Sequence, residues 1–198
     1  MRELFADIAI IGGSTGGVAA ALAALRAGKT VIMSEETDWI GGQFTSQAVP
    51  PDEHRWIEQF GCTRSYRRLR DDVRRFYRDY YPLTPQARSN PELNPGGGWV
   101  SRLCHEPRIS HLVLNAHLQP YFATGKLQIL LGFRPVAAQC DGDFVRAVTL
   151  QNEAGEQITV CAPYFLDATE LGEVLPLAGV ESVVGAESRA QTGEPNAL

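Results

Sequence analysis

Glycines near the N-terminus have the spacing of a turn that binds phosphate. Four glycines occupy six positions, Gly12 to Gly17, between an apolar run and an alanine-rich segment. The pattern is Gly12-x-Ser14-x-x-Gly17, with serine where a dinucleotide fingerprint has glycine. Gly12 permits a tight turn, Gly17 lets a helix pack closely on a strand, and the Ser14 hydroxyl can donate to a phosphate oxygen. Free N–H groups at a helix N-terminus bind phosphate. The candidate binding residues of this turn are Gly12, Gly13, Ser14, Thr15, Gly16 and Gly17.

The segments around this turn predict a βαβ unit over residues 5–36. Apolar β-branched runs flank a segment of strong helix formers that ends before Gly28. The expected elements are a strand over residues 7–11, a helix over 18–27 and a strand over 30–33. Glu35 directly follows the second strand, with Glu36 beside it, where an acidic residue accepts hydrogen bonds from ribose hydroxyls. The unit therefore predicts dinucleotide binding.

The rest of the chain predicts a helical insertion, a small meander and further parallel strands. Arginines and aspartates alternate along a predicted helix over residues 64–81, which favours a solvated face with i,i+4 ion pairs. Its apolar stripe would be Leu69, Val73, Phe76 and Tyr80. We further expect a loop over 82–98, a helix over 110–122, a third strand over 126–133, antiparallel strands over 135–140, 144–151 and 156–161, and a buried strand over 164–169.

Two further motifs carry a family resemblance. TDWIGGQFTSQ, residues 37–47, places a second glycine pair after the acidic strand end, and DATELGE, residues 167–173, ends an apolar strand after the meander. With the first glycine turn, they resemble the FAD-dependent oxidoreductases of the glutathione-reductase-like superfamily, whose members have two dinucleotide-binding domains. Within it, the chain resembles a bacterial group with a WIGGQ-T-S type loop. Such relatives often have glycine where Glu170 stands.

The resemblance implies FAD as the cofactor and adds candidate contacts. It places the pyrophosphate at the first glycine turn, the ribose at Glu35, and adenine at the backbone of Val136. The pyrimidine and ribityl side would lie near the second glycine pair and the Ala-Thr motif. The added candidates are Gly41, Gly42, Gln43, Thr45, Val136, Ala168 and Thr169.

Composition excludes several other classes of function. The chain has 198 residues and a net charge of −5, with no basic excess that would indicate nucleic acid or a membrane surface as a partner. No stretch of about 18 apolar residues predicts a membrane span, and the N-terminus lacks the pattern of a signal peptide, so we expect a cytoplasmic protein. The widely spaced cysteines, Cys62, Cys104, Cys140 and Cys161, favour incidental thiols over a disulfide or a metal site.

No catalytic group is assigned from the sequence. Cys104-His105 is a candidate nucleophile and base, but sequence neighbours rarely face each other in that way. His54 follows the second glycine pair and is a candidate for a position near the flavin. His111 and His117 are six residues apart, so they lie on different faces of a helix, and we expect no metal site.

Taken together, the sequence predicts an α/β, Rossmann-like FAD-binding domain over residues 1–198. It comprises the βαβ core (5–36), the helical insertion (52–122), the third strand, meander and fourth strand (126–170) and a loop-rich tail (171–198). The expected function is hydride transfer between an unidentified small organic substrate and FAD. The closing strand and substrate domain of such enzymes are not found, so the chain resembles the N-terminal portion of a longer enzyme.

Two alternatives remain open. A nicotinamide-dependent reductase would need a Tyr-Lys or His dyad, and the two lysines, Lys29 and Lys126, are not so placed. A non-catalytic or truncated dinucleotide-binding domain is the other alternative, because the substrate half of the enzyme is not found.

Overall fold

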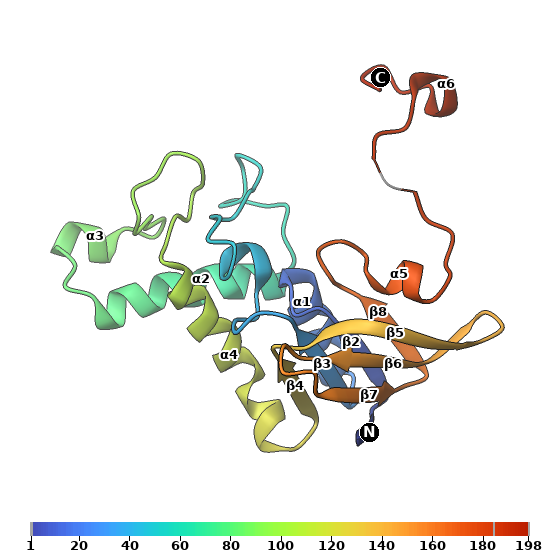
Figure 1. The fold of residues 1–198 in the computed structure, drawn as a ribbon. Helices are drawn as coiled ribbons and strands as arrows, with labels where there is room; N and C mark the ends of the chain where they lie inside the picture. The colour runs from blue at the N-terminus through green and yellow to red at the C-terminus, as the bar shows by residue number, and fades with distance from the viewer. Residues whose placement is uncertain (1, 184, 198) are drawn as a thin grey trace.

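Two four-stranded sheets form the centre of the computed structural model, which describes residues 2–183 and 185–197 (Figure 1). The first sheet is parallel, in the order β4-β3-β2-β8, with strands β2 (Ile8–Ile11), β3 (Val31–Glu35), β4 (Leu127–Leu131) and β8 (Tyr164–Asp167). The second, in the order β1-β7-β6-β5, contains β1 (Arg2–Phe5), β5 (Arg134–Asp141), β6 (Phe144–Gln151) and β7 (Gln157–Cys161). Strands β5, β6 and β7 form the predicted antiparallel meander.

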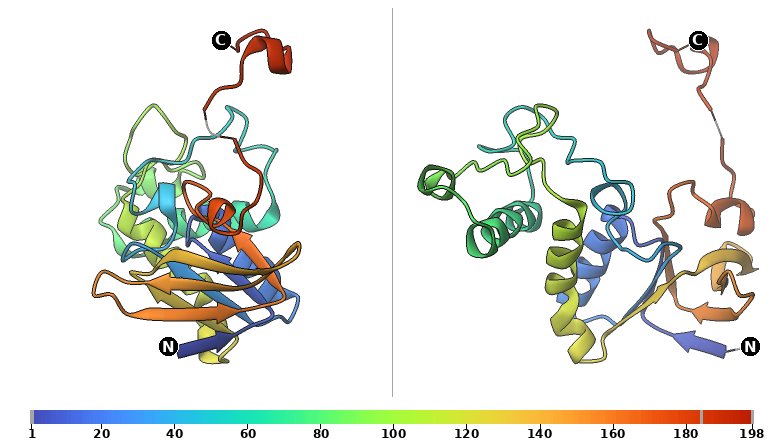
Figure 2. Two further views of the ribbon diagram at one scale, coloured as in Figure 1. Left: turned by 45° about the vertical axis from the view of Figure 1, so that its right-hand side comes forward. Right: turned by 60° about the vertical axis from the view of Figure 1, so that its left-hand side comes forward.

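The parallel sheet is covered on both faces because its side chains alternate between them. Ile10 and Met33 pack in a core with helices α1 (Thr15–Arg26) and α4 (Pro107–Ala123), whereas Ala9, Ile11 and Ile32 pack against the meander. Figure 2 shows these helices on one side of the sheet and the meander on the other. The near-continuous apolar runs read from the sequence are explained by this two-sided burial.

The predicted fold class is confirmed, with local differences. Helix α1 begins at Thr15, earlier than predicted, because Ser14 caps it. Strand β1 was not predicted. It pairs in parallel with β7, placing Leu4 opposite Val160. β1 has only four residues and three of them are exposed, so its alternation of apolar and polar residues is too short to be recognised as a strand. Short helices also lie in segments predicted as loops: α3 (Pro85–Ser89), α5 (Val174–Leu177) and α6 (Arg189–Thr192).

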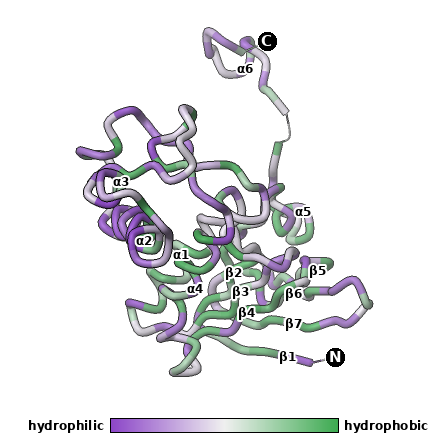
Figure 3. Tube along the Cα trace, turned by 90° about the vertical axis from the view of Figure 1, so that its left-hand side faces the viewer, coloured by the Kyte–Doolittle hydropathy of each residue, from purple (hydrophilic) through white to green (hydrophobic). Residues whose placement is uncertain are grey.

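The long helix of the insertion, α2 (Arg64–Tyr80), corrects one prediction. Figure 3 shows it as a mostly hydrophilic segment. Arg68 and Arg75 are exposed and do pair with Asp72. A solvated face is nevertheless wrong for Arg70 and Arg74, whose side chains are only 1% and 3% exposed. Their acidic partners come from residues 53–58, outside the helix, which i,i+4 spacing does not reveal.

The apolar stripe of α2 also differs from the prediction at one position. Leu69 and Val73 are buried as predicted. Tyr80 is 74% exposed, whereas Tyr77 is 4% exposed and its hydroxyl accepts from the backbone N–H of Glu106 at 2.9 Å. The N-terminal end of α4 therefore selects which tyrosine is buried.

Candidate dinucleotide-binding site

The first glycine turn brings two backbone segments into direct contact. Gly12 has φ +102°, and a Cβ on it would lie 2.3 Å from the carbonyl oxygen of Ala168. A Cβ on Gly17 would lie 2.2 Å from the carbonyl oxygen of Gly12. Both glycines are therefore required by close packing of the turn, helix α1 and the end of β8.

Ser14 has a structural role that explains its place in the fingerprint. It is the N-cap of α1, and its Oγ accepts from the N–H of Gly17 at 3.2 Å. The hydroxyl proton stays available to an acceptor. Within the part of the chain that the structure describes, the N–H groups of Ser14, Thr15 and Gly16 have no acceptor. Such groups at a helix N-terminus, with the helix dipole behind them, favour an anion.

Glu35 is the last residue of β3 and is buried at the turn. Its Oε2 accepts from the N–H of Gly13 at 2.9 Å, and its Oε1 accepts from the N–H and hydroxyl of Thr37, both at 2.8 Å. These bonds fix the carboxylate beside the first glycine turn. Each carboxylate oxygen has further acceptor capacity for a ribose hydroxyl.

The second glycine pair is bound to the first turn by its backbone. The N–H of Gly41 donates to the carbonyl oxygen of Gly13 at 2.7 Å, and the Thr15 hydroxyl donates to the carbonyl oxygen of Gly41, also at 2.7 Å. Gly41 has φ +110°, which excludes most other residues. Buried Thr45 closes the loop by donating to the carbonyl oxygen of Ile40 at 2.8 Å.

A cavity of about 200 Å³ lies where these segments meet. Its lining is Gly12, Ser14, Ser34, Glu35, Glu36, Thr37, Gly42, Ser46, Gln47, Phe133, Arg134, Pro135, Ala168, Thr169, Glu170 and Glu173. Ligand pockets of proteins typically occupy about 300–1,000 Å³, so this cavity encloses only part of a dinucleotide. Four glutamates and one arginine line it, so any pyrophosphate must be bound mainly by backbone N–H groups.

Seven of the predicted residues line the cavity: Gly12, Ser14, Glu35, Glu36, Gly42, Ala168 and Thr169. Six further predicted residues lie in the two glycine motifs or in the first turn of α1 without lining the cavity: Gly13, Thr15, Gly16, Gly17, Gly41 and Thr45. Gln43 donates to the carbonyl oxygen of Pro50 at 3.3 Å. Val136 lies on β5 outside the lining, next to Pro135 and Arg134, which belong to it.

Sequence reasoning missed several lining residues. Phe133, Arg134 and Pro135 follow the third parallel strand, and the carboxyl ends of neighbouring parallel strands are where ligands bind in open α/β sheets. That rule could have found them. Ser46, Gln47 and Glu173 come from loops whose paths no sequence pattern gives.

Acidic residues after β8 crowd one side of the cavity. Asp167 accepts from the N–H and hydroxyl of Thr169 and from the N–H of Val174, which sets the turn after the strand. Burial, with the nearby charges of Glu36 and Asp167, raises the pKa of Glu173. Glu170 also lines the cavity, and its Oε1 would lie 3.0 Å from a Cβ on Gly42. The Glu170 carboxylate is therefore close to the second glycine pair.

The candidate catalytic pair is not assembled. Cys104 Sγ contacts the carbonyl oxygen of Ser101 at 3.7 Å. His105 is occupied on both ring nitrogens, by the carbonyl oxygen of Leu103 at 2.9 Å and the hydroxyl of Ser110 at 2.5 Å. Burial lowers the pKa of His105. Both ring nitrogens of His105 therefore have structural partners, and neither is free to activate the thiol.

The other histidines are also engaged in packing. His54 packs against Gly61, Trp56 and Phe60, and it does not line the cavity. His111 stacks on Trp39 with ring centroids 4.9 Å apart, while His117 contacts Asp72 at 2.7 Å, so the two face different partners as predicted.

Neither a metal centre nor a membrane-spanning helix is found among the described residues. No group of three or more His, Cys, Asp or Glu side chains in residues 2–183 and 185–197 is arranged to hold a metal ion. None of the helices in those residues combines the length and apolar character needed to cross a membrane.

Comparison with solved structures shows the same fold in flavoproteins and related enzymes. The chain is similar to a geranylgeranyl bacteriochlorophyll reductase-like protein from Thermoplasma acidophilum (17% identity, TM-score 0.55, covering 93% of this chain and 44% of that one). It is also similar to a flavoprotein/dehydrogenase from Cytophaga hutchinsonii (15%, TM-score 0.56, 93% and 44%). The OxyS anhydrotetracycline hydroxylase from Streptomyces rimosus gives 16% identity and a TM-score of 0.52, over 93% and 36%.

These matches cover only part of each solved protein. The chain spans less than half the length of each of these three proteins. No curated protein sequence matches it significantly.

The family itself is shown by the sequence. Residues 7–198 match the family described as FAD dependent oxidoreductase, which is nearly the whole chain. The match confirms the predicted cofactor and the predicted oxidoreductase class at the level of the family. With its glycine turn, acidic strand end and meander, the chain belongs to the FAD-dependent oxidoreductase family.

Proposed function

We propose that this chain forms the FAD-binding portion of an enzyme that transfers hydride between a small organic substrate and FAD. In this proposal the pyrophosphate binds at the N-terminus of α1, and Glu35 accepts from the adenosine ribose. When bound, FAD would supply the hydride-accepting chemistry at its isoalloxazine ring. The residues of this chain bind and orient the cofactor.

The observation that carries the proposal is the set of free N–H groups at Ser14, Thr15 and Gly16. Of these residues, Ser14 lines the cavity beside Glu35, and Thr15 and Gly16 follow it at the start of α1. No side chain of the described residues accepts from the three N–H groups. Backbone N–H groups in a turn fixed by glycines can bind a diphosphate without a lysine or arginine. The donor set therefore fits the family's cofactor.

The remaining lining residues suggest how the ends of the cofactor are placed. Phe133 and Pro135 offer apolar surface beside Glu35, which suits adenine. Ala168 and Thr169 directly follow β8 and lie against Gly12, which suits the ribityl side. The carboxylate of Glu170 lies close to both turns and would repel a pyrophosphate, so binding is expected to be weaker than in relatives with glycine there.

Finer assignments belong to the same proposal. We propose membership of the glutathione-reductase-like superfamily, supported by the two glycine loops and by the Ala-Thr end of β8. We also propose a single FAD-binding domain, a cytoplasmic location, a substrate domain supplied by sequence beyond this chain, and no nucleic-acid or membrane partner. The acidic charge balance supports the last of these.

The test compares two isosteric substitutions at Gly16. A Cβ at Gly16 would meet only Ser14 Oγ, at 3.7 Å, so the side chain has room. Gly16→Asp places a carboxylate at the free N–H groups, and Gly16→Asn places a neutral side chain of the same shape there. We expect Gly16→Asp to weaken FAD binding about tenfold or more relative to Gly16→Asn, because like charges repel at close range. Flavin absorbance after desalting, or calorimetric titration, measures the affinity.

The fold of both variants is checked by circular dichroism and thermal unfolding. An acidic side chain in the first turn of a helix is favourable, so Gly16→Asp is expected to unfold at no lower temperature than Gly16→Asn. Equal FAD affinity of the two variants would place the pyrophosphate elsewhere. Binding of NAD but not FAD by the unsubstituted chain would overturn the cofactor assignment for this site.

A further inference from the structure

A second cavity lies outside the dinucleotide site, between residues 53–58 and residues 92–102. It has a volume of about 530 Å³. Its lining is mainly polar: Glu53, Arg55, Glu58, Glu92, Asn94, Gly98, Trp99, Val100, Ser101 and Arg102. None of these residues belongs to the glycine turns or to the lining of the first cavity.

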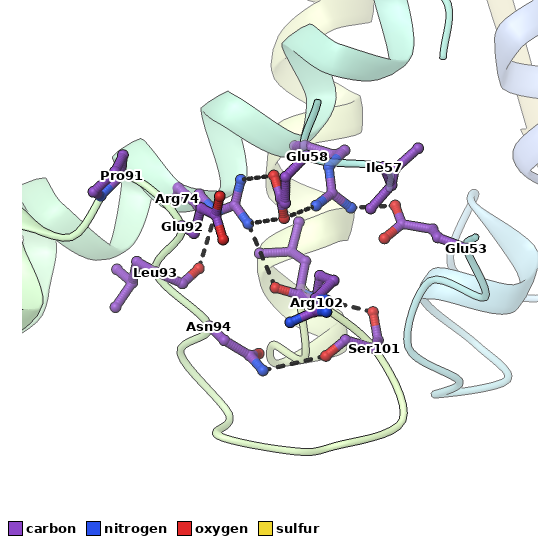
Figure 4. Close-up of polar contacts among 12 residues, drawn as sticks. Glu53, Ile57, Glu58, Arg74, Pro91, Glu92, Leu93, Asn94, Ser101 and Arg102 are labelled. Atoms are coloured by element: carbon purple, nitrogen blue, oxygen red, sulfur yellow. Dashed lines mark hydrogen bonds and ion pairs between the residues drawn. The ribbon is translucent and has the colours of Figure 1, made fainter. Parts of the chain in front are cut away.

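The floor of this cleft is a buried network of charges (Figure 4). Glu58 receives hydrogen bonds from Arg70 and from both terminal nitrogens of Arg74, one of them at 3.0 Å. Arg74 also donates to the carbonyl oxygen of Leu93 at 2.9 Å, which attaches the 92–102 loop to α2. The floor is therefore held in place from both sides of the cleft.

Glu53 is incompletely satisfied in this network. Its side chain is 5% exposed, and its Oε1 accepts from Arg70 and from the hydroxyl of Tyr66 at 2.5 Å. Its Oε2 is buried and has no hydrogen-bond partner among the residues that the structure describes. A buried carboxylate oxygen without a donor is costly, and native structures rarely leave one. Because Glu53 also lines the cleft, a donor on a bound molecule can satisfy it.

The mouth of the cleft carries charges without ion-pair partners. Over residues 2–183 and 185–197, Arg55, Arg102 and Glu92 form no ion pair. All three line the cleft and are exposed. The two guanidinium groups offer bidentate donors to a carboxylate.

An exposed aromatic surface completes the lining. Trp99 is 95% exposed and Val100 is 57% exposed, although both belong to the cleft. Large aromatic side chains at concave surfaces commonly contact the apolar part of a ligand. The cleft thus combines an inner acceptor, outer cationic donors and an apolar wall.

From this arrangement we propose that the cleft binds a small α-amino acid, or an amine-bearing acid of similar size. The ammonium group donates to Glu53 Oε2, the carboxylate binds Arg55 and Arg102, and the side chain packs against Trp99. An ammonium is preferred to a hydroxyl because a charged donor best offsets the burial of a carboxylate oxygen. This proposal is independent of FAD binding, since it rests on other residues.

The test uses four probes of matched shape. Leucine carries both charges, isocaproate lacks the amine, isoamylamine lacks the carboxylate, and leucic acid has a hydroxyl in place of the amine. The three tryptophans, Trp39, Trp56 and Trp99, give separate indole N–H signals in a nitrogen–proton NMR spectrum of the labelled chain. Trp99→Phe assigns the signal in the cleft, and Trp39, which stacks on His111, serves as an internal control.

We expect leucine to shift the Trp99 signal saturably and the other three probes to bind at least about tenfold more weakly, because each loses a charge-assisted contact. Arg102→Met, at an exposed position, and Glu53→Gln are each expected to weaken leucine binding about tenfold. Arg146→Met, on β6, is the matched control and should leave it unchanged.

Several outcomes would overturn the proposal. They are no saturable shift with any probe, equal binding of isocaproate and leucine, or equal binding of leucic acid and leucine. Glu53→Gln removes a partner of buried Arg70 and can disturb the fold. If Glu53→Gln unfolds, leucine binding by Arg102→Met is the deciding measurement. Unchanged leucine binding in folded Arg102→Met would exclude the assigned carboxylate contact.

Discussion

The glycine turns of the parallel sheet and the charged cluster of the insertion are built on opposite principles. In the turns, the absence of side chains lets backbone segments approach closely, as at Gly17, where a Cβ would lie 2.2 Å from the carbonyl oxygen of Gly12. In the insertion, two long arginine side chains, Arg70 and Arg74, are buried and reach acids 12 to 17 residues away in sequence. The first arrangement follows from local spacing, and the second depends on how distant segments meet.

The largest expected effect comes from breaking the charged cluster. Arg70→Met leaves Glu53 without its charged partner in a buried site, so we expect a loss of about 3–5 kcal/mol in the free energy of unfolding. Arg75→Ala removes the i,i+3 ion pair of an exposed arginine with Asp72, which keeps its contacts with Arg68 and His117, and is expected to cost less than about 1 kcal/mol. Urea denaturation followed by circular dichroism measures both. A similar loss in the free energy of unfolding for the two variants would show that burial does not make the Arg70 interactions stronger than those of Arg75.

A smaller effect is expected in the first glycine turn, where alanine substitutions at the neighbouring Gly16 and Gly17 should change the stability of the fold in opposite directions. Gly17→Ala forces a methyl group into the Gly12 carbonyl, and overpacking of this kind costs about 1–3 kcal/mol. Gly16→Ala adds a methyl group on a helix with only an ordinary contact to Ser14 Oγ, and should stabilise the fold by about 0.5 kcal/mol. Thermal unfolding of the pair is the measurement, and a destabilised Gly16→Ala would contradict the open environment of that position.

The smallest effect concerns the pH dependence of stability. The two regions shift carboxyl pKa values in opposite directions. At Glu58 burial opposes ionisation, but hydrogen bonds and charges from Arg74 and Arg70 outweigh it and lower the pKa. Glu58 therefore stabilises the fold above its unfolded pKa of about 4.5, and this contribution is lost as the pH falls through the lowered value. At Glu173 burial and nearby acids raise the pKa, so the folded state loses stability as the pH rises from about 4.5 through the raised value.

Glu173→Gln separates these contributions. We expect it to raise the unfolding temperature slightly at pH 7 and to leave it unchanged near pH 3.5, where the carboxyl is protonated in both states. The effect is modest because Glu173 is partly exposed to solvent. The unfolding temperature measured across this pH range tests it, and an unfolding temperature lowered at pH 7 would contradict the raised pKa.

The contrast between these two regions explains where sequence reasoning succeeded. The parallel strands, helix α1 and the meander follow from local patterns of apolar residues, helix formers and turns, and the structure confirms them. Ser14 shows where prediction from the sequence ends. Its place in the glycine motif is evident, but its role as the N-cap follows only once α1 is known to begin at Thr15. Phe133 and Pro135 line the first cavity only because β4 lies beside β3 in the parallel sheet.

The class of fold, the family and the first glycine turn could be predicted from the sequence, because residues close together in the chain carry these signals. By contrast, the sequence did not predict which arginines of α2 are buried, which tyrosine enters the core, or how Glu53 comes to line a cleft with Arg102. These outcomes depend on contacts between segments far apart in the chain. A helical pattern specifies which side chains share a face, but the partner of that face is set by the packing of the whole domain.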